Sequence, residues 1–265
     1  MYQILNYSFM QNALIAVIII SPILGILGTM VVQKQMSFFS DALGHSALTG
    51  IAVGAILGMT NANISMIVFG VIFALLLNHI RFRTKIATDT IISVCASVSL
   101  AIGLAILSRG GNFAQYSSFL VGDILSIRQS ELPILGICAV LVIAYWILSV
   151  NALNATTIHP TLAKSFNIPT RLSENLFAVI LAILVMISIR WIGVLLINAL
   201  LILPAAASRN LAGNMREYHL YTILISLFCG LLGLFMSYFC NIATGPMIVI
   251  YAGIIYFATY MKCRH

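Results

Sequence analysis

Long apolar segments recur along the whole chain and constrain its fold more than any other feature. Each is close to the roughly 20 residues that an α-helix needs to cross the hydrocarbon core of a bilayer. Of the 265 residues, 62% are hydrophobic and only 7% are charged, whereas soluble domains carry roughly a quarter of their residues as charges. The sequence therefore predicts an all-α polytopic transmembrane helix bundle, a single domain over residues 1–265. It has about nine spans, at approximately 12–33, 41–58, 62–80, 88–108, 131–150, 173–190, 191–209, 219–237 and 244–261.

The segment 113–127 is short for a span and is interrupted by Gly122 and Asp123. We expect a short re-entrant or outer helix there. With the N-terminus outside and the C-terminus cytoplasmic, this arrangement places all but three of the 13 Lys and Arg residues on the cytoplasmic side. The three outside are Arg109, Arg128 and Arg190. That asymmetry is what the positive-inside rule requires of a multi-pass protein of the cell membrane.

The net charge of +7 comes from basic residues that lie mostly singly between apolar runs. This pattern is typical of anchoring to membrane lipid and not of binding nucleic acid. The sequence has no H-E-x-x-H, G-x-S-x-G or P-loop motif, so it lacks the signatures of a metalloprotease, a serine hydrolase and an ATPase. We expect a chain that is not itself an enzyme and holds no permanent cofactor.

The strongest candidate site is the pair Asp41 and His45 at the start of the second apolar run. Residues four apart lie on one face of a helix, so a carboxylate and an imidazole come together. These ligands suit Zn²⁺, Mn²⁺ or Fe²⁺. Gly50, Gly54 and Gly58 follow at four-residue spacing and would allow close packing against a neighbouring helix. Alternatively, Asp41 complements the helix dipole and hydrogen-bonds His45.

Two further polar positions could contact a cation on its path. Asp123 could attract cations to a pore mouth or cap a broken helix, and Asn198 could line a polar cavity or mediate a helix contact. Asn78 and His79 are expected to form interfacial hydrogen bonds or to act in metal exit. His219 and His265 are expected at the surface.

The interruption between the fifth and sixth runs predicts a short cytoplasmic helix. Proline is tolerated in a first helical turn, and asparagine tolerates the left-handed conformation that ends a helix. His159-Pro160 and Asn167-Ile-Pro169 fit these two positions. The segment could dock a soluble partner or could be an ordinary connecting loop.

Four segments, taken in order, resemble the family 3 ABC permeases that import zinc and manganese. SDALGHSALTG at 40–50 is similar to the family pattern G-D-A-[IL]-S-H-A-x-x-P-G, and FLVGDIL at 119–125 is similar to LFGDIL. HPTLAKSFNIP at 159–169 resembles the loop DPELARALGLP, and GVLLINALLILPAAASR at 193–209 resembles GVLLVxALLVxPAATAR. The chain departs from the pattern at Thr49, where the family has proline and the helix is expected to be straighter, and at His159, where it has aspartate.

The resemblance implies a type II ABC importer-like permease that works as a homodimer, with an extracytoplasmic metal-binding protein and cytoplasmic ATP-binding-cassette subunits that hydrolyse ATP. It implies that Asp41 and His45 meet the ion. The ATPase would dock on a coupling helix formed by about 159–169, with His159, Pro160, Ala163, Lys164, Asn167 and Pro169 as coupling residues. We therefore expect import of a divalent transition metal, Zn²⁺ favoured and Mn²⁺ or Fe²⁺ possible. The alternative is an ion-coupled secondary metal transporter without an ATPase.

Overall fold

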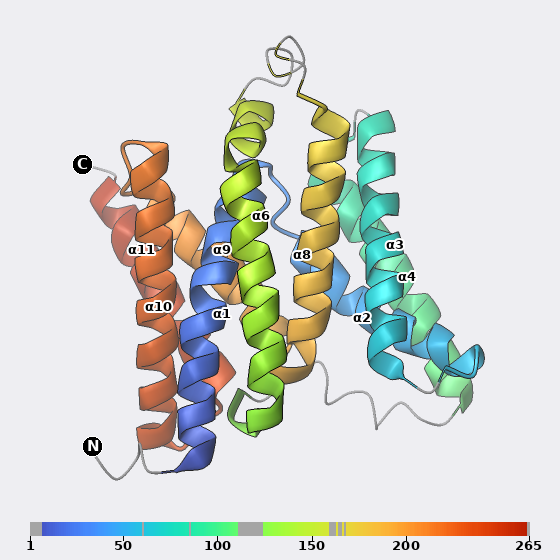
Figure 1. Cartoon of the computed structure of the whole chain (residues 1–265), viewed down its shortest axis with the longest axis horizontal. Helices are drawn as coiled ribbons and strands as arrows, with labels where there is room; N and C mark the ends of the chain where they lie inside the picture. Colours follow the sequence, from blue (N-terminus) through green and yellow to red (C-terminus); the bar gives the residue numbers. More distant parts are fainter. Residues whose placement is uncertain are drawn as a thin grey trace. The chain divides into compact units, whose positions relative to one another are not determined.

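The structure is a computed structural model, and it describes residues 7–59, 61–84, 86–110, 124–158, 163, 166 and 168–263. Within these ranges every regular element is a helix (Figure 1). The long helices are α1 (Ser8–Gln33), α2 (Phe39–Ile56), α3 (Ala62–Arg83), α4 (Thr88–Gly110), α6 (Leu132–Ile158), α8 (Thr170–Ile192), α9 (Val194–Arg209), α10 (Met215–Cys240) and α11 (Thr244–Cys263). Two short 3₁₀ helices, η2 (Ile124–Ser126) and η3 (Gln129–Glu131), precede α6. The prediction of an all-α bundle is confirmed.

Each predicted apolar run coincides with one long helix, but the prediction of nine full spans is not met. In the described part of the chain, seven helices are long and apolar enough to cross a membrane, and these are α1, α3, α4, α6, α8, α10 and α11. The other two long helices are not among these seven, for separate reasons. α9 has only 16 residues, and α2 carries the polar residues Asp41 and His45. Only Gly193, with φ of +80°, separates α9 from α8. Of the predicted short helix at 113–127, only residues 124–127 are described, and they contain η2.

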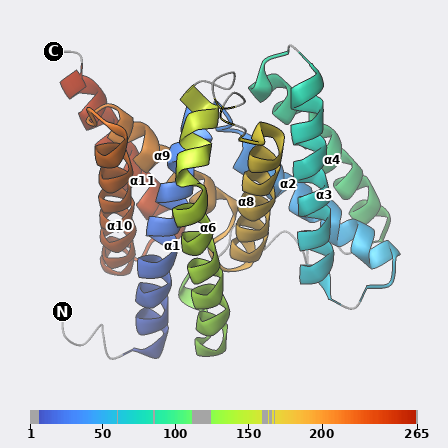
Figure 2. The same cartoon turned by 45° about the horizontal axis from the view of Figure 1, so that its top comes forward.

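The chain divides into two compact units, and the first comprises Met1–Val32, Val121–Trp146 and Trp191–His265. In this unit α9, α10 and α11 pack against one another (Figure 2). Small residues allow close approach: a Cβ added at Gly233 of α10 would lie 2.7 Å from the Cα of Ile248 in α11. The hydroxyl of Ser226 in α10 donates to the carbonyl of Ser21 in α1 at 2.6 Å. Such contacts between small residues are typical of helices packed in membranes.

The second unit comprises Gln33–Leu120 and Ile147–Arg190, and α2 packs in it against α3 and α4. A Cβ at Gly50 would lie 3.0 Å from the Cα of Met66, and one at Gly54 would overlap Ser65. The predicted packing role of these two glycines is therefore confirmed. Gly58 differs, because it follows α2 with φ of +69° and has open space around it. It serves the turn after α2. The expectation of one domain over residues 1–265 stays a prediction.

Thr49 fixes α2 to α4. Its hydroxyl donates to the carbonyl of Ser99, and the Ser99 hydroxyl donates back to Thr49 Oγ1 at 3.2 Å. One turn further along α4, a Cβ at Gly103 would lie 2.6 Å from Thr49 Oγ1. The threonine that replaces the family proline thus supplies an interhelical hydrogen bond in a helix that is continuous from Phe39 to Ile56.

Candidate functional site

The first half of α2 brings Asp41 and His45 together, as the four-residue spacing predicts. The distance from His45 Nε2 to Asp41 Oδ2 is 3.5 Å, and the two side chains are 35% and 43% exposed. The helix is held in place by its apolar side, where Phe39 and Leu43 are fully buried. The packing of α2 therefore presents a carboxylate and an imidazole together on a partly accessible face.

The second ring nitrogen of His45 has an unmet hydrogen-bonding capacity. Nδ1 is buried and has no hydrogen-bond partner among the described residues. A buried polar atom of this kind is costly unless it is satisfied. A neutral imidazole can offer one nitrogen as a ligand while the other carries its proton. Because Nδ1 is closed off, the ring nitrogen left to meet an ion is Nε2, which faces Asp41 Oδ2.

Two side chains are too few to enclose a metal ion. Structural zinc sites use four protein ligands, and catalytic ones use three and keep an open position. Among the residues that the structure describes, no group of three or more His, Cys, Asp or Glu side chains could hold a metal. The pair suits a brief contact with an ion that keeps water or other ligands. The alternative, a first-turn Asp41 that complements the helix dipole, fits the same geometry.

Neither of the two residues predicted to line the cation path, Asp123 and Asn198, is described in the same unit as Asp41 and His45. Asn198 is half-buried in α9, which belongs to the first unit, whereas Asp41 and His45 belong to the second. Asp123 lies outside the described residues. The roles of both residues stay predictions.

Of the predicted coupling residues, Ala163 and Pro169 lie within the described part. Ala163 is buried and its carbonyl accepts from the amide of Ile168 at 3.1 Å. A hydrogen bond between residues five apart, from the later amide to the earlier carbonyl, is typical of the motif that ends a helix. Phe166, between them, is 78% exposed. The remaining four, His159, Pro160, Lys164 and Asn167, lie outside the described residues.

Sequence reasoning missed a buried charge cluster at the helix ends of the second unit. Glu174 of α8 accepts from Lys34 Nζ at 3.4 Å through Oε1 and from Arg81 Nη1 at 3.0 Å through Oε2. Lys34 also donates to the hydroxyl of Thr156 in α6 at 3.4 Å. Burial lowers the pKa of Lys34, and the nearby Glu174 carboxylate raises it in part. One carboxylate thus joins the chain after α1 to the end of α3 and the start of α8.

Two expectations about polar residues near helix ends had different outcomes. Asn78 forms the expected kind of hydrogen bond, because its Nδ2 donates to Asn175 Oδ1 at 2.6 Å. His219 was expected at the surface and is half-buried, because its ring packs edge-on against Trp146 with centroids 5.2 Å apart. Both ring nitrogens of His219 are buried without a hydrogen-bond partner among the described residues. In the sequence, His219 lies close to the charged start of α10, and that pattern is typical of an exposed side chain. His265 lies outside the described residues.

Comparisons with known proteins agree over nearly the full length. A sequence model described as the ABC 3 transport family matches residues 6–263. The manganese import system permease protein ScaB of Streptococcus parasanguinis is 30% identical over 258 residues, 96% of this chain and 91% of that protein. The high-affinity zinc uptake system membrane protein ZnuB of Haemophilus influenzae is 30% identical over 257 residues, 97% of this chain and 98% of that protein.

A solved structure shares the fold. PsaBC from Streptococcus pneumoniae, in complex with Fab, matches with a TM-score of 0.83 at 27% identity and covers 98% of this chain and 93% of that chain. The apolar helices, the family match and the relatives named as permease or membrane proteins all describe a multi-pass membrane protein. The chain belongs to the ABC 3 transport family.

Proposed function

We propose that this chain is the permease subunit of an ABC importer that carries Zn²⁺ or Mn²⁺ across the cell membrane into the cytoplasm. The observation that carries the proposal is the Asp41–His45 pair, 3.5 Å apart on a partly exposed face of α2. A carboxylate oxygen and an imidazole nitrogen suit both metals. The relatives named for manganese import and for zinc uptake support the same substrate class.

In this proposal, an extracytoplasmic binding protein delivers the ion, and Asp41 and His45 from two copies of the chain hold it briefly. A transfer site must bind weakly enough to release its ion, so few protein ligands are an advantage. Asp123 would attract the cation on the outer side, and Asn198 would contact it along its path. The N-terminus is then outside the cell and the C-terminus in the cytoplasm.

Energy would come from separate cytoplasmic ATPase subunits that dock on the segment 159–169. The exposed ring of Phe166 supports this part of the proposal, because a large apolar side chain outside the helices offers a surface to a partner. The buried Ala163 would fix the segment to the permease. His159, Pro160, Lys164, Asn167 and Pro169 are the other proposed coupling residues.

The preference for zinc stays a prediction. ScaB, named for manganese, and ZnuB, named for zinc, are each 30% identical to this chain. Zinc favours nitrogen and sulfur ligands in tetrahedral sites, whereas manganese accepts more oxygen ligands. Competition between ⁶⁵Zn and ⁵⁴Mn for uptake would decide between them.

The test is metal uptake by vesicles that hold the chain with its ATPase and binding protein. Asp41→Asn removes the carboxylate charge and His45→Gln removes the imidazole nitrogen, while each keeps a side chain of similar size. Asp89→Asn is the matched control, because Asp89 is a first-turn acid of α4 as Asp41 is of α2. We expect the two α2 variants to assemble and hydrolyse ATP but to lose uptake, and the Asp89 variant to transport normally.

If both α2 variants import metal at the wild-type rate, the pair is structural and the ion takes another path. An ion-coupled carrier that works alone is the second candidate. It predicts metal uptake without any ATPase, driven by a proton or sodium gradient. Uptake that requires ATP and a co-purifying ATPase excludes it.

A further inference from the structure

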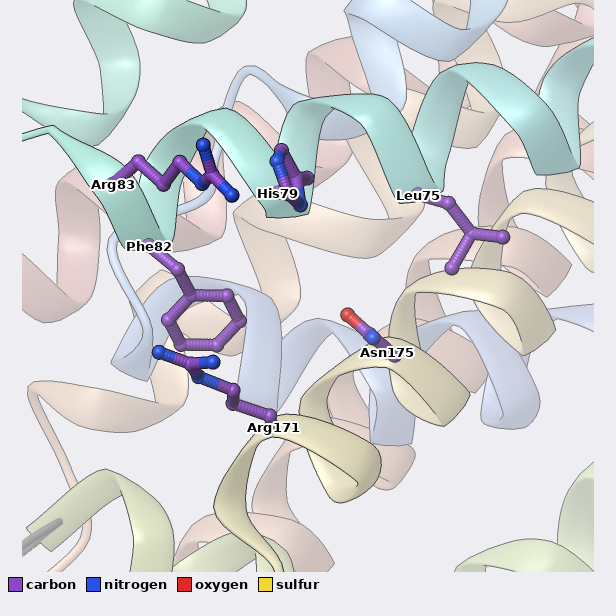
Figure 3. Close-up of a pocket in the computed structure, with 6 residues that line it drawn as sticks. All are labelled: Leu75, His79, Phe82, Arg83, Arg171 and Asn175. Atoms are coloured by element: carbon purple, nitrogen blue, oxygen red, sulfur yellow. The ribbon is translucent and has the colours of Figure 1, made fainter.

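A pocket of about 360 Å³ opens between α3 and α8 in the second unit. It is lined by Leu75, His79, Phe82, Arg83, Arg171 and Asn175. Figure 3 shows the side chains of α3 along one wall and those of α8 along the other. The guanidinium of Arg171 lies over the ring of Phe82, with 6.0 Å between Cζ and the ring centroid. Two guanidinium groups and one imidazole therefore border one cavity.

The positive charge of this pocket is not compensated within the described part of the chain. No carboxylate there forms an ion pair with Arg83 or Arg171. The nearby acid, Glu174, is already engaged by Lys34 on one oxygen and by Arg81 on the other. The pocket thus retains a charge that an anion would neutralise, and an arginine fork matches the oxygens of a phosphate.

The position of the pocket along the helices points to a lipid. Arg83 is the last residue of α3 and Arg171 is the second of α8, and both helices are long and apolar enough to span a membrane. Leu75 lines the pocket two turns before Arg83 and is 37% exposed. With both helices across a bilayer, the basic end would lie at the level of the lipid headgroups, and the apolar wall would continue into the hydrocarbon.

We propose that this pocket binds the phosphate of an anionic phospholipid such as phosphatidylglycerol. Arg83 and Arg171 bind the phosphate oxygens, and an acyl chain follows Leu75. Asn175 adds a donor: its Oδ1 accepts from Asn78 at 2.6 Å, which leaves its Nδ2 for the ligand. Basic pockets between membrane helices are a known form of lipid headgroup recognition. The proposal goes beyond metal transport and does not depend on it.

The test is lipid titration of the detergent-purified chain, followed by native mass spectrometry. The probes are dioctanoyl phosphatidylglycerol, dioctanoyl phosphatidylcholine and glycerol phosphate. Arg83→Gln, Arg171→Gln and their combination remove the pocket charges, and Arg216→Gln, an exposed arginine of α10, is the matched control. We expect about fivefold weaker phosphatidylglycerol binding for each pocket variant and on the order of 25-fold for both, from the effect of single basic residues near anionic headgroups. Arg216→Gln should bind as the wild type does.

The wild type alone already tests the proposal, so it stays falsifiable if the double variant fails to fold. Binding of phosphatidylcholine as tight as that of phosphatidylglycerol would overturn it. If glycerol phosphate binds as tightly as phosphatidylglycerol, the pocket recognises a free phosphate and the proposal of a lipid ligand is overturned. Unchanged phosphatidylglycerol binding by a folded double variant would also overturn it. So would pocket variants that still bind the lipid but lose a co-purifying ATPase, since the pocket would then be a docking site for a protein.

Discussion

Arg81, in the last turn of α3, and Glu174, near the start of α8, form an ion pair with 3.0 Å between Nη1 and Oε2. The other oxygen of Glu174 accepts from Lys34, which also donates to Thr156 near the end of α6. The cluster therefore contacts both helices that flank the segment 159–169. A movement of that segment would therefore be transmitted to the ends of α6 and α8, and the cluster links these ends to α3 and to the chain after α1.

Replacing Glu174 by Gln should destabilise the protein more than any single exposed charge change. The side chains of Lys34 and Glu174 are 3% and 12% exposed, so Glu174→Gln leaves the buried Lys34 and the partly exposed Arg81 without this counter-charge. Removing one member of a buried ion pair costs about 3–5 kcal/mol. We expect a clear drop in the thermal unfolding midpoint in detergent.

Glu217→Gln is the control for this change. Glu217 is an acid near the start of α10, with its carboxylate at the exposed helix end beside Asn214. Its replacement should cost about 1 kcal/mol or less, as for other helix-end interactions. The double variant Lys34→Met/Glu174→Gln should be more stable than Glu174→Gln alone, because it removes one unpaired charge. A double variant less stable than the single one would contradict the ion-pair account.

Gly103→Ala should destabilise the contact between α4 and α2. The added Cβ would lie 2.6 Å from Thr49 Oγ1 and 2.9 Å from its Cα, so backbone must shift. Such overpacking costs about 1–3 kcal/mol. Gly136→Ala in α6 is the matched control, because nothing lies within 4 Å of its added Cβ. There the higher helix propensity of alanine should stabilise by up to about 1 kcal/mol. Equal unfolding midpoints for the two variants would refute the close approach at Gly103.

Metal uptake should fall with pH if His45 ligates the ion. An imidazole must be neutral to ligate, and the hydrogen bond with the Asp41 carboxylate raises the pKa of His45 above its ordinary value of about 6.5. Uptake per ATP hydrolysed should therefore fall when the pH is lowered from about 7.5 to about 5.5. Protonation is the cause, so the loss appears as the pH decreases through that pKa. His45→Gln should have low uptake that no longer follows this profile. Unchanged wild-type uptake at the lower pH would count against direct ligation.

The sequence predicts the features of this fold that depend on local periodicity. The apolar runs locate all the long helices of the described part, and the spacing of Asp41 and His45 places both on one face of α2. Gly50 and Gly54 follow the same rule, since each lies on the face toward α3. In each case the helix period alone determines which residues share a face.

Contacts between distant segments could not be read in this way. Lys34 and Glu174 are 140 residues apart, and nothing in either neighbourhood indicates that the two meet. The partial burial of His219 likewise depends on Trp146, which lies in another helix.

Phe166 provides the most direct test of the proposed docking segment. Its ring is 78% exposed although Ala163, three residues earlier, is buried. An apolar anchor at the centre of an interface often contributes at least about 2 kcal/mol, which is roughly thirtyfold in affinity. Phe166→Ala should therefore reduce the ATPase retained on the purified permease without lowering the unfolding midpoint. Phe257→Ala, which truncates a ring 65% exposed on α11, is the control and should retain the ATPase fully. If both variants retain it equally, the ATPase docks elsewhere, because loss of an anchor cannot leave its interface unchanged.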